Sequence, residues 1–533
     1  LLPGNLKLSS SVWCYGSDNT NRHCRFRNLC FFPKTNDFVF FHGSKSVYFG
    51  IPENRFNPAL ADLASVENHN TQYFHFTDMP ESESQSFNKT FIDKRFFIFN
   101  RFNPGNLMHV LHDDLIPLIS SLKEICGAVT IKETQECLKS FELFLADKHP
   151  PGMFFNLYEE LSAGSPVLAI NLTDNMICFA ESFVGLRKHT LWYQYGFKIP
   201  QGPLKRDMKI VTHEVKIFIE MFRGKFGKKY SFTDDESYAV LITRNNRIII
   251  NEAEVLEELH KCSGLKMKKI SLEENSLQEI IQVIHNSKVL VGMHGALLVL
   301  LMFLKPNSIV IELFPYGVNP DNYTPYKTLA TLPGFGLIYH AWRNTELKNT
   351  IIKPDNPVEL GGIRHLPLTV QQQILDSPEV PQHLCCNNPE WLFRIYQDTI
   401  VNISSFSQVL QHALLQQVEG KIFQQHNENL IRRKLYPGEV QNLACLVSSD
   451  ETWTSLVLSW EKPWNLKYIN FSLVVYEVLV QEVNTEKVHS VQVKTTKHTF
   501  YKLQQNTDYM IWLRCQVDGR SGHFSTYPLH CYT

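Results

Sequence analysis

Hydrophobic and polar residues alternate in a regular way between residues 238 and 313. Continuous apolar runs predict buried strands, and segments with apolar residues every three or four positions predict helices between those strands. The expected strands are 238–243, 266–271, 288–291 and 308–313, and the expected helices are 251–260, 276–286 and 296–304. Asn251 and Glu254 have the spacing of a capping box at the start of the first helix. This alternation predicts a parallel, doubly wound sheet.

A weaker α/β alternation precedes it, and helices follow it. Expected strands at 95–99, 141–146 and 176–184 enclose helices at 106–123 and 156–161, short strands at 37–41 and 46–49 come earlier, and later helices are expected at 388–398 and 403–420. We therefore expect two α/β domains, at residues 1–200 and 201–435, because 533 residues exceed what one hydrophobic core accommodates.

The last hundred residues have the period-two alternation of β-strands. Residues 455–460 alternate with Trp460 on the inward side, and Tyr509 follows Leu503 by six residues. An inward Trp on an early strand and a Tyr at a strand corner are features of β-sandwiches. Residues 436–533 therefore resemble an all-β fibronectin type III domain, a module that by itself implies no catalytic activity.

The composition excludes some classes of protein. The chain has 44% hydrophobic and 20% charged residues, as in an ordinary globular protein. Its 52 basic and 53 acidic residues are nearly balanced, so neither a nucleic-acid footprint nor a polybasic membrane arm is expected. The longest apolar stretch, 289–304, is about 16 residues long and contains two glycines and a histidine, against the ~20 apolar residues of a membrane span. We expect an N-terminal signal or anchor ahead of Leu1.

Cysteines and glycosylation motifs indicate an oxidising compartment. None of the 12 cysteines forms the paired C-x-x-C motifs of a zinc site, and several are clustered, at Cys14, Cys24 and Cys30, at Cys385 and Cys386, and at Cys445, Cys515 and Cys531. Five N-x-S/T sequons lie at Asn88, Asn171, Asn322, Asn402 and Asn470. Together they favour the lumen of the secretory pathway.

A glycine-containing turn follows the expected strand 288–291. A helix is expected to begin near Gly295, where free backbone N–H groups and the helix dipole favour an anion. Gly295 would let a diphosphate approach the backbone, and His294 could donate a hydrogen bond to it. The alternative interpretation is an ordinary β–α turn with a satisfied histidine.

Arg244 and Arg247 follow the first strand of the same sheet. Doubly wound sheets bind ligands beyond the C-terminal ends of their strands, so we expect both arginines at the edge that carries His294. Arginine binds phosphate oxygens with two parallel hydrogen bonds and keeps its charge. The coincidence favours a diphosphate site over two solvated loop arginines.

Glu312 interrupts the otherwise apolar strand 308–313. A buried carboxylate is costly without a partner. It would accept hydrogen bonds from ribose hydroxyls, or it would pair with an arginine; both interpretations stay open.

A third cluster of polar residues occupies the start of the expected helix 106–123, at His109, His112, Asp113 and Asp114. His109 and Asp113 are four residues apart and share one helix face. Such a pair facing a cleft suits general-base catalysis, and Asp113, His109 and His112 are all candidate bases. A metal site and a structural helix cap are the alternatives. Arg101 either orients the helix start or faces the donor phosphates.

Together these elements resemble glycosyltransferase family 61. The N-x-x-H-x-x-x-D element of that family is matched by Asn106, His109 and Asp113, its H-G-A turn by His294, Gly295 and Ala296, and its arginine-bearing strand end by Arg244 and Arg247. The resemblance covers residues 90–345. The fibronectin module and the stretches 192–196, 319–327 and 389–398 narrow it to one branch of the family.

This resemblance implies a GT-B-type pair of Rossmann-like domains followed by the fibronectin sandwich, in a single-pass type II enzyme of the endoplasmic reticulum membrane whose catalytic part is lumenal. Such an enzyme would transfer GlcNAc from UDP-GlcNAc to the 4-hydroxyl of mannose O-linked to proteins such as α-dystroglycan. The reaction would invert the anomeric carbon, with the diphosphate held by Arg244, His294 and the amides near Gly295, and with Asp113, through His109, taking the acceptor proton.

The sequence contains no Asp-x-Asp motif, so we expect no obligatory metal cofactor. A non-catalytic lumenal binding protein with the same fold is the main alternative, and the presence of both His109 and Asp113 favours the enzyme. A metal-dependent hydrolase centred on His109, His112 and Asp113 would need a third ligand, and no motif supplies one.

Overall fold

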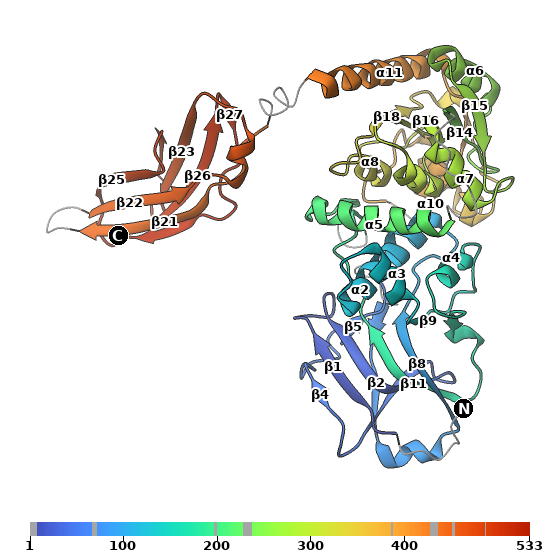
Figure 1. The fold of residues 1–533 in the computed structure, drawn as a ribbon. Helices are drawn as coiled ribbons and strands as arrows, with labels where there is room; N and C mark the ends of the chain where they lie inside the picture. The colour runs from blue at the N-terminus through green and yellow to red at the C-terminus, as the bar shows by residue number, and fades with distance from the viewer. Residues whose placement is uncertain are drawn as a thin grey trace. The chain divides into compact units, whose positions relative to one another are not determined.

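The computed structural model describes residues 8–66, 72–196, 200–226, 237–384, 387–426, 435–449, 454–485 and 487–533 (Figure 1). The chain divides into two compact units, Leu1–Gln417 and Val418–Thr533. Within the described ranges, none of the helices combines the length and the apolar character that a membrane crossing requires. Cys385 and Cys386 lie outside these ranges.

A mixed sheet forms the N-terminal part of the first unit. Its strand order is β10-β9-β8-β11-β2-β1-β4, and β3 and β7 branch from β2. The strands are β1 (Ser11–Tyr15), β2 (His23–Phe32), β3 (Asp37–His42), β4 (Tyr48–Phe49), β7 (Thr77–Pro80), β8 (Lys89–Phe99), β9 (Glu142–Leu145), β10 (Val167–Leu168) and β11 (Met176–Val184). The strands expected at 95–99, 141–146 and 176–184 are confirmed. Parallel pairs join β10, β9, β8 and β11 in that order, and also β1 with β4 and β3 with β7. Strand β2 pairs antiparallel with β1, β3 and β11, so the sheet is mixed.

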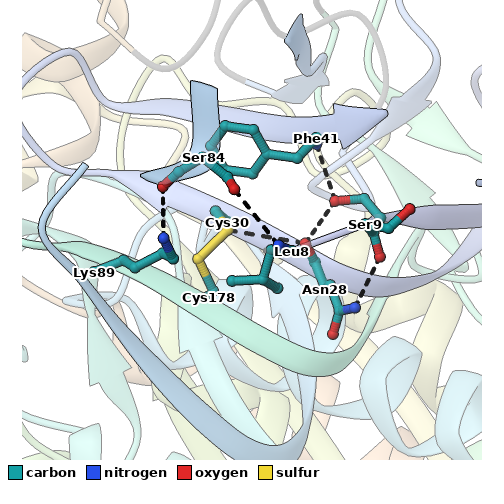
Figure 2. Close-up of a disulfide and its surroundings, with 9 residues drawn as sticks. Leu8, Ser9, Asn28, Cys30, Phe41, Ser84, Lys89 and Cys178 are labelled. Atoms are coloured by element: carbon teal, nitrogen blue, oxygen red, sulfur yellow. Dashed lines mark hydrogen bonds between the residues drawn. A yellow bond between two sulfur atoms is a disulfide. The ribbon is translucent and has the colours of Figure 1, made fainter. Parts of the chain in front are cut away.

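Disulfides fasten this sheet and its helices. Cys30 and Cys178 are directly opposite each other on β2 and β11, and their disulfide closes 148 residues of chain (Figure 2). Beside it, Asn28 donates a side-chain hydrogen bond to the carbonyl of Ser9, which holds the segment before β1. The other disulfides within the described ranges are Cys14–Cys24, Cys126–Cys137 and, in the second unit, Cys445–Cys531. They support the expectation of an oxidising environment.

The helix expected at 106–123 is present but contains a wider turn. Helix α1 (Leu107–His109) passes through a π-helical segment, Val110–Leu115, into α2 (Ile116–Cys126). The side chain of Asn106 caps it by accepting the N–H of Met108 at 3.0 Å. Insertions of this kind occur mostly at functional sites. Helices α3 (Ile131–Leu138) and α4 (Phe155–Glu160) complete this part.

The second sheet is wholly parallel, as predicted. Its order is β15-β14-β16-β17-β18, formed by β14 (Tyr238–Ile242), β15 (Lys266–Ile270), β16 (Ser287–Met293), β17 (Ile309–Phe314) and β18 (Ile338–Arg343). Strand β18 lies beyond the four strands expected from the sequence. On β14, Leu241 packs with helices α6 (Glu252–Ser263) and α11 (Ile403–His426). Val240 packs on the opposite face with α7 (Leu277–His285) and the 3-10 helix η5 (Ala296–Phe303). Both faces are therefore covered, which explains why the strands are apolar throughout.

The surrounding helices are α5 (Met208–Phe226), α6 (Glu252–Ser263), α7 (Leu277–His285), the 3-10 helix η5 (Ala296–Phe303), α8 (Pro325–Ala330), α9 (Leu368–Asp376), α10 (Pro389–Ile395) and α11 (Ile403–His426). Short two-stranded pairs are β5 (Ala61–Asp62) with β6 (Tyr73–Phe74), β12 (Tyr193–Gln194) with β13 (Gly202–Pro203), and β19 (Thr350–Ile351) with β20 (Asp398–Thr399).

The capping box expected at Asn251 is wrong. The side chain of Asn251 does not cap α6; it exchanges hydrogen bonds with the backbone of Val401 at 2.9 and 2.8 Å and donates to Glu254. A tertiary contact 150 residues away has taken the place of the local one. A capping box does form at the start of α7, between Ser276 and Glu279.

The second unit is all-β beyond residue 435. One sheet has the order β21-β22-β25, and the other has β24-β23-β26-β27 with β28 beside β26. Its strands are β21 (Gln441–Ser449), β22 (Thr454–Glu461), β23 (Val474–Glu482), β24 (Val488–Val493), β25 (Lys497–Leu503), β26 (Asp508–Val517), β27 (Arg520–Ser521) and β28 (Leu529–Tyr532). Trp460 is 5% exposed in the core, and the hydroxyl of Tyr509 accepts the N–H of Gln504 at 3.2 Å. The predicted inward Trp and corner Tyr are confirmed.

Candidate active site

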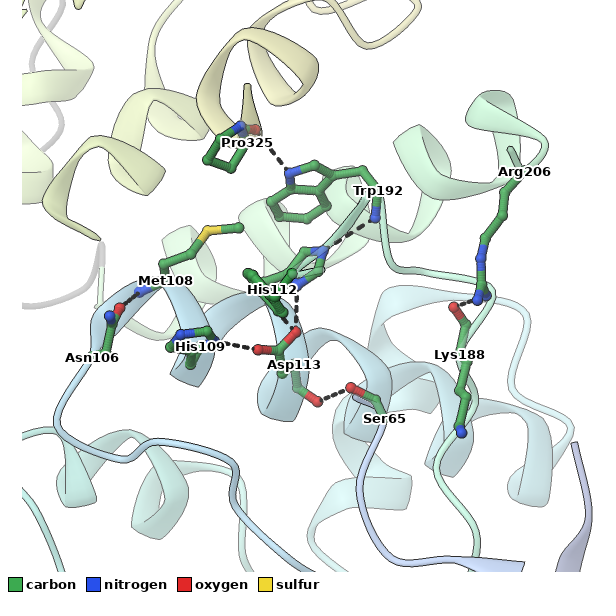
Figure 3. A network of polar contacts seen from close by, with 11 residues as sticks. Ser65, Asn106, Met108, His109, His112, Asp113, Lys188, Trp192, Arg206 and Pro325 are labelled. Atoms are coloured by element: carbon green, nitrogen blue, oxygen red, sulfur yellow. Dashed lines mark hydrogen bonds and ion pairs between the residues drawn. The ribbon is translucent and has the colours of Figure 1, made fainter. Parts of the chain in front are cut away.

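A buried carboxylate holds two histidines at the start of the long helix. Asp113 Oδ2 lies 2.6 Å from Nδ1 of His109, and Asp113 Oδ1 lies 2.5 Å from Nδ1 of His112 (Figure 3). The carbonyl of Asp113 also accepts the hydroxyl of Ser65 at 2.6 Å. The side chain of Asp113 is 1% exposed and that of His109 is 14% exposed. Asp113 therefore orients His109, and His109 is the member of the pair that a substrate can reach.

His112 is closed off by its neighbours. Its Nε2 accepts the backbone N–H of Trp192 at 3.1 Å, so the proton of the neutral ring is on Nδ1, which donates to Asp113. The hydroxyl of Tyr195 lies 3.0 Å from that Nδ1 and donates to Asp113 Oδ1 at 3.2 Å. His112 is 0% exposed with both nitrogens engaged, so it is not available as the base.

The pKa values of the two adjacent carboxyls shift in opposite directions. Burial tends to raise the pKa of Asp113, but its electrostatic interaction with the His112 ring and the hydrogen bonds from both histidines outweigh burial, and the pKa is lowered. Burial, followed by the charges of Asp113 and Asp147, raises the pKa of Asp114 well above its usual value, against a hydrogen bond from Tyr158. Asp113 is thus the ionised partner of the histidines, and Asp114, bonded to Tyr158 at 2.6 Å, belongs to the interior.

Arg101 has a structural role. Its guanidinium grips Asp147 with two hydrogen bonds, of 3.0 and 2.8 Å, and donates to the carbonyls of His149 and Pro151. The side chain is 0% exposed. Of the two roles that the sequence left open for Arg101, the structure favours orientation of the chain before the helix, and no surface remains for a phosphate.

Arg244 and Arg247 lie together beyond the end of β14. Arg247 donates to the carbonyl of His294 at 2.7 Å and stacks 4.6 Å from the ring centre of Tyr396. Arg244 makes no hydrogen bond or ion pair with any described residue. Burial, followed by the charge of Arg247, lowers the pKa of Arg244 to about 10. A half-buried cation without an anionic partner is what an anion site contains before its ligand binds.

Gly295 has a different role from the one expected. A Cβ at this position would collide with the guanidinium of Arg244 and lie 3.1 Å from that of Arg247. The missing side chain therefore makes room for the two arginines against the turn, and not directly for a diphosphate. Ala296 and Leu297, which follow, line the same pocket as the arginines.

Both interpretations of Glu312 are wrong. Its carboxylate is 0% exposed, so a ribose hydroxyl does not reach it, and its partners are not arginines. Oε1 lies 2.5 Å from Nδ1 of His294, and Oε2 accepts a hydrogen bond from the hydroxyl of Tyr339 at 2.6 Å. Glu312 is the residue that orients His294. Because Nδ1 is engaged, Nε2 of His294 is the atom left for a ligand, and its side chain is 10% exposed.

A pocket of about 320 Å³ joins the two parts of the first unit. One wall carries Gly105, Asn106, Leu107, Met153 and Phe154, and the other carries Thr243, Arg244, Asn246, Arg247, Leu272, Glu273, Ala296, Leu297 and Tyr396. The helix start that carries His109 therefore lies against the arginines. The Oδ1 atom of Asn246 is buried and has no hydrogen-bond partner among the described residues.

Tyr326 stands between the two clusters. Its ring is 5.4 Å from that of His294. Burial and the charge of Glu312 raise its pKa, and the charges of Arg247 and Arg244 oppose that rise. The charge of Tyr326 in turn contributes to the raised pKa of Tyr195, after burial and Asp113. Tyr326 therefore interacts electrostatically with groups of both clusters.

Sequence reasoning missed Trp192, Tyr195, Asn246, Tyr326 and Tyr396. Each lies within the stretches 192–196, 243–247, 319–327 or 389–398 that carried the family resemblance, so these stretches held the available signal. These stretches did not predict a chemical role for any of the five residues, because the contacts of a side chain in a loop do not follow from its spacing in the sequence. In the described part of the chain, no three His, Cys, Asp or Glu side chains gather as a metal site.

The pocket contains Arg244, which has no described hydrogen-bond partner, at the C-terminal edge of a parallel sheet, and its other wall is the start of the helix that carries the Asp113–His109 pair. This arrangement is the one expected of a transferase that uses a nucleotide donor. Residues 170–311 match the family Glycosyltransferase 61, and residues 439–529 match the fibronectin type III domain. The chain belongs to glycosyltransferase family 61, with a C-terminal fibronectin type III domain.

Its relatives include protein O-linked-mannose β-1,4-N-acetylglucosaminyltransferase 2 of several vertebrates. The Xenopus tropicalis protein is 43% identical over 509 residues, and the Homo sapiens protein is 41% identical over 510 residues. Each alignment covers 94% of this chain and 85% of the relative. Among solved structures, the FN5 domain of Drosophila Lar is 21% identical, with a TM-score of 0.15, and covers 18% of this chain and 96% of that chain.

Proposed function

We propose that this protein is an inverting glycosyltransferase that moves GlcNAc from UDP-GlcNAc to the 4-hydroxyl of mannose O-linked to proteins of the α-dystroglycan type. The observation that carries the proposal is Arg244, a half-buried guanidinium without a described partner in a pocket shared with the helix start of His109. The activity in the printed name of the relatives supports the sugar and the linkage.

The base is His109. Its Nδ1 is held by Asp113, so Nε2 faces outward with its lone pair and takes the proton of the mannose 4-hydroxyl. The acceptor oxygen forms a bond to the anomeric carbon of GlcNAc as the bond from that carbon to the UDP oxygen breaks. The leaving oxygen keeps the electron pair. Attack opposite the leaving group inverts the anomeric carbon.

The leaving UDP gains negative charge, and fixed positive groups lower the barrier most when they are in place beforehand. Arg244 and Arg247 provide this charge, and Nε2 of His294 provides a further contact. Ala296 and Leu297, the first two residues of η5, line the same pocket, and the N–H groups of a first helical turn have no partner within the helix. Arginines and backbone amides here take the role that a divalent cation has in other transferases, so no metal is obligatory.

We propose a GT-B-type arrangement with Rossmann-like domains at 1–200 and 201–435 and the fibronectin domain at 436–533. The parallel second sheet and the pocket between the two parts support it. We also propose a lumenal catalytic part of a single-pass type II protein of the endoplasmic reticulum membrane. Four disulfides support this location, and so do exposed sequon asparagines at 88, 171, 402 and 470.

A panel of nucleotide sugars assayed against an O-mannosyl peptide tests the proposal. We expect transfer from UDP-GlcNAc in preference to the other donors, with a β-linked product at the 4-hydroxyl. His109→Gln should abolish it while leaving UDP binding intact. UDP binding without transfer from any donor would favour the alternative, a non-catalytic lumenal binding protein, and the intact Asp113–His109 pair is the observation against that alternative.

The fibronectin domain is proposed to help hold the acceptor protein, because one mannose offers little contact area. Deletion of residues 437–533 should then reduce kcat/KM on an O-mannosylated protein more than on a simple mannoside. Equal losses on the two acceptors would contradict this part of the proposal.

A further inference from the structure

Trp192 connects the base cluster to the donor side of the pocket. Its side chain is 0% exposed. Its backbone N–H donates to Nε2 of His112 at 3.1 Å, and its indole Nε1–H donates to the carbonyl of Pro325 at 3.1 Å (Figure 3). The indole and the His112 ring also meet edge to face, with centroids 4.1 Å apart. One residue therefore binds two elements that lie 80 and 133 positions away in the sequence.

The first of these hydrogen bonds determines the protonation of His112. An N–H that points at Nε2 needs a lone pair there, and a doubly protonated ring would place two donors against each other. The ring is therefore kept neutral, with its proton on Nδ1 toward Asp113. In this state His112 donates to Asp113 Oδ1 and leaves Oδ2 to hold His109.

The second hydrogen bond reaches the anion pocket. Pro325 is the first residue of α8, and the next residue, Tyr326, lies near His294 and in the field of Arg244 and Arg247. The N–H of Thr324, just before the helix, donates to the hydroxyl of Tyr193 at 3.3 Å. The start of α8 is thus attached twice to the segment that carries Trp192.

We propose that Trp192 is a positioning residue, which holds His112 as the neutral Nδ1–H tautomer and thereby aligns Asp113 and His109. Trp192 does so only while its indole is hydrogen-bonded to the start of α8, beside the donor pocket. This inference rests on the proposed function for its kinetic consequence. It adds that donor-side structure and base alignment are coupled through one indole.

Trp192→Phe tests the coupling because it keeps the aromatic ring and the backbone N–H and removes only the bond to Pro325. We expect kcat to fall at least tenfold, while the Kd of UDP changes less than threefold. Trp342→Phe is the matched control, since Trp342 is 3% exposed and its indole donates to Ser405 at 2.9 Å outside the pocket. This variant should keep kcat within twofold at a comparable loss of melting temperature.

The two variants separate positioning from general loosening. The titratable groups in contact with His112 are Asp113 on its own helix and Tyr195 from the neighbouring segment. Both groups are still present in Trp192→Phe, so a loss of kcat reports their alignment. An unchanged kcat in Trp192→Phe overturns the proposal, as does an equal kcat loss in Trp342→Phe.

A measurement independent of activity completes the test. In ¹⁵N-histidine-labelled protein, His112 should appear as the Nδ1–H tautomer in wild type and Trp342→Phe, and as a mixture of ring states in Trp192→Phe. An Nε2–H tautomer in wild type, or an unmixed Nδ1–H tautomer in Trp192→Phe, overturns the inference. Absence of UDP binding and transfer in wild type refutes the proposed function instead, and the two failures are therefore distinguishable. Loss of UDP binding in Trp192→Phe would assign Trp192 to the donor site and also overturn the proposal.

Discussion

Replacing Arg244 with methionine should separate ligand binding from stability. The lowered pKa of Arg244, from 12.5 to about 10, means that the folded protein disfavours the charged guanidinium. At about 1.4 kcal/mol per unit, this corresponds to about 3 kcal/mol, and allowance for the solvent that still reaches the side chain leaves ~2 kcal/mol. The sign follows from the cation: the penalty is fully present below about pH 10 and fades as the pH rises toward 12.5.

Arg244→Met should therefore stabilise the ligand-free protein while it abolishes tight UDP binding. With an unfolding entropy of about 2.1 cal/mol/K per residue over the unit Leu1–Gln417, ~2 kcal/mol is a rise in Tm of ~2 °C. Loss of charged hydrogen bonds to the diphosphate, each about 1.5–3 kcal/mol, should weaken UDP about 10- to 100-fold.

Scanning calorimetry with and without UDP, together with titration calorimetry, measures both effects. At a UDP concentration of 100 times its Kd, wild type should gain about 2.7 kcal/mol, and the variant should gain far less. Arg364→Met is the control, because Arg364 is 61% exposed and pairs with Asp355 at the surface. A clear destabilisation by Arg244→Met, or an unchanged Kd for UDP, would refute the reasoning.

Three other outcomes are expected. Asp113→Asn should lower kcat by at least ~100-fold. The variant should also be less stable than wild type above the unfolded pKa of about 3.9, and this difference should disappear as the pH falls through the lowered pKa of folded Asp113. Melting curves measured from acid to neutral pH would show the difference. A chelator should leave transfer largely intact; complete loss that only Mn²⁺ or Mg²⁺ restores would contradict the role of Arg244 and Arg247. Replacing both Cys30 and Cys178 with serine should cost about 5 kcal/mol, because their disulfide closes 148 residues, against about 3 kcal/mol for the 10-residue loop of Cys14–Cys24; similar denaturant midpoints for the two pairs would disprove the loop-length argument.

The second sheet was predictable because its signal is local. Strands covered on both faces must be apolar throughout, and parallel strands need helical connections, so the pattern between residues 238 and 313 leaves few topologies open. The same reasoning placed Arg244 and His294 at one edge, since both follow parallel strands of that sheet. The strand pairing of the first sheet was harder to predict, because β2 pairs antiparallel with β11 and the paired cysteines are 148 residues apart. No local sequence pattern indicates that pairing.

The hydrogen-bond partners of the polar side chains depend on tertiary structure. Glu312 bonds to His294 and Tyr339. Asn251 bonds to the backbone of Val401 and does not cap its own helix, and Arg101 bonds to Asp147. A buried polar group takes the partner that folding brings within about 3 Å, whatever its distance along the chain.

The amino-acid sequence therefore determined which residues carry charge and at which strand ends they lie, because those depend on local periodicity. Which nitrogen of His112 carries the proton depended on the contact of His112 with Trp192, 80 residues away. The proposed role of His109 as the base depended on its contact with Asp113, one helical turn away. Hydrogen-bond geometry arises only when the segments pack, and it is this geometry that sets the chemistry of the site.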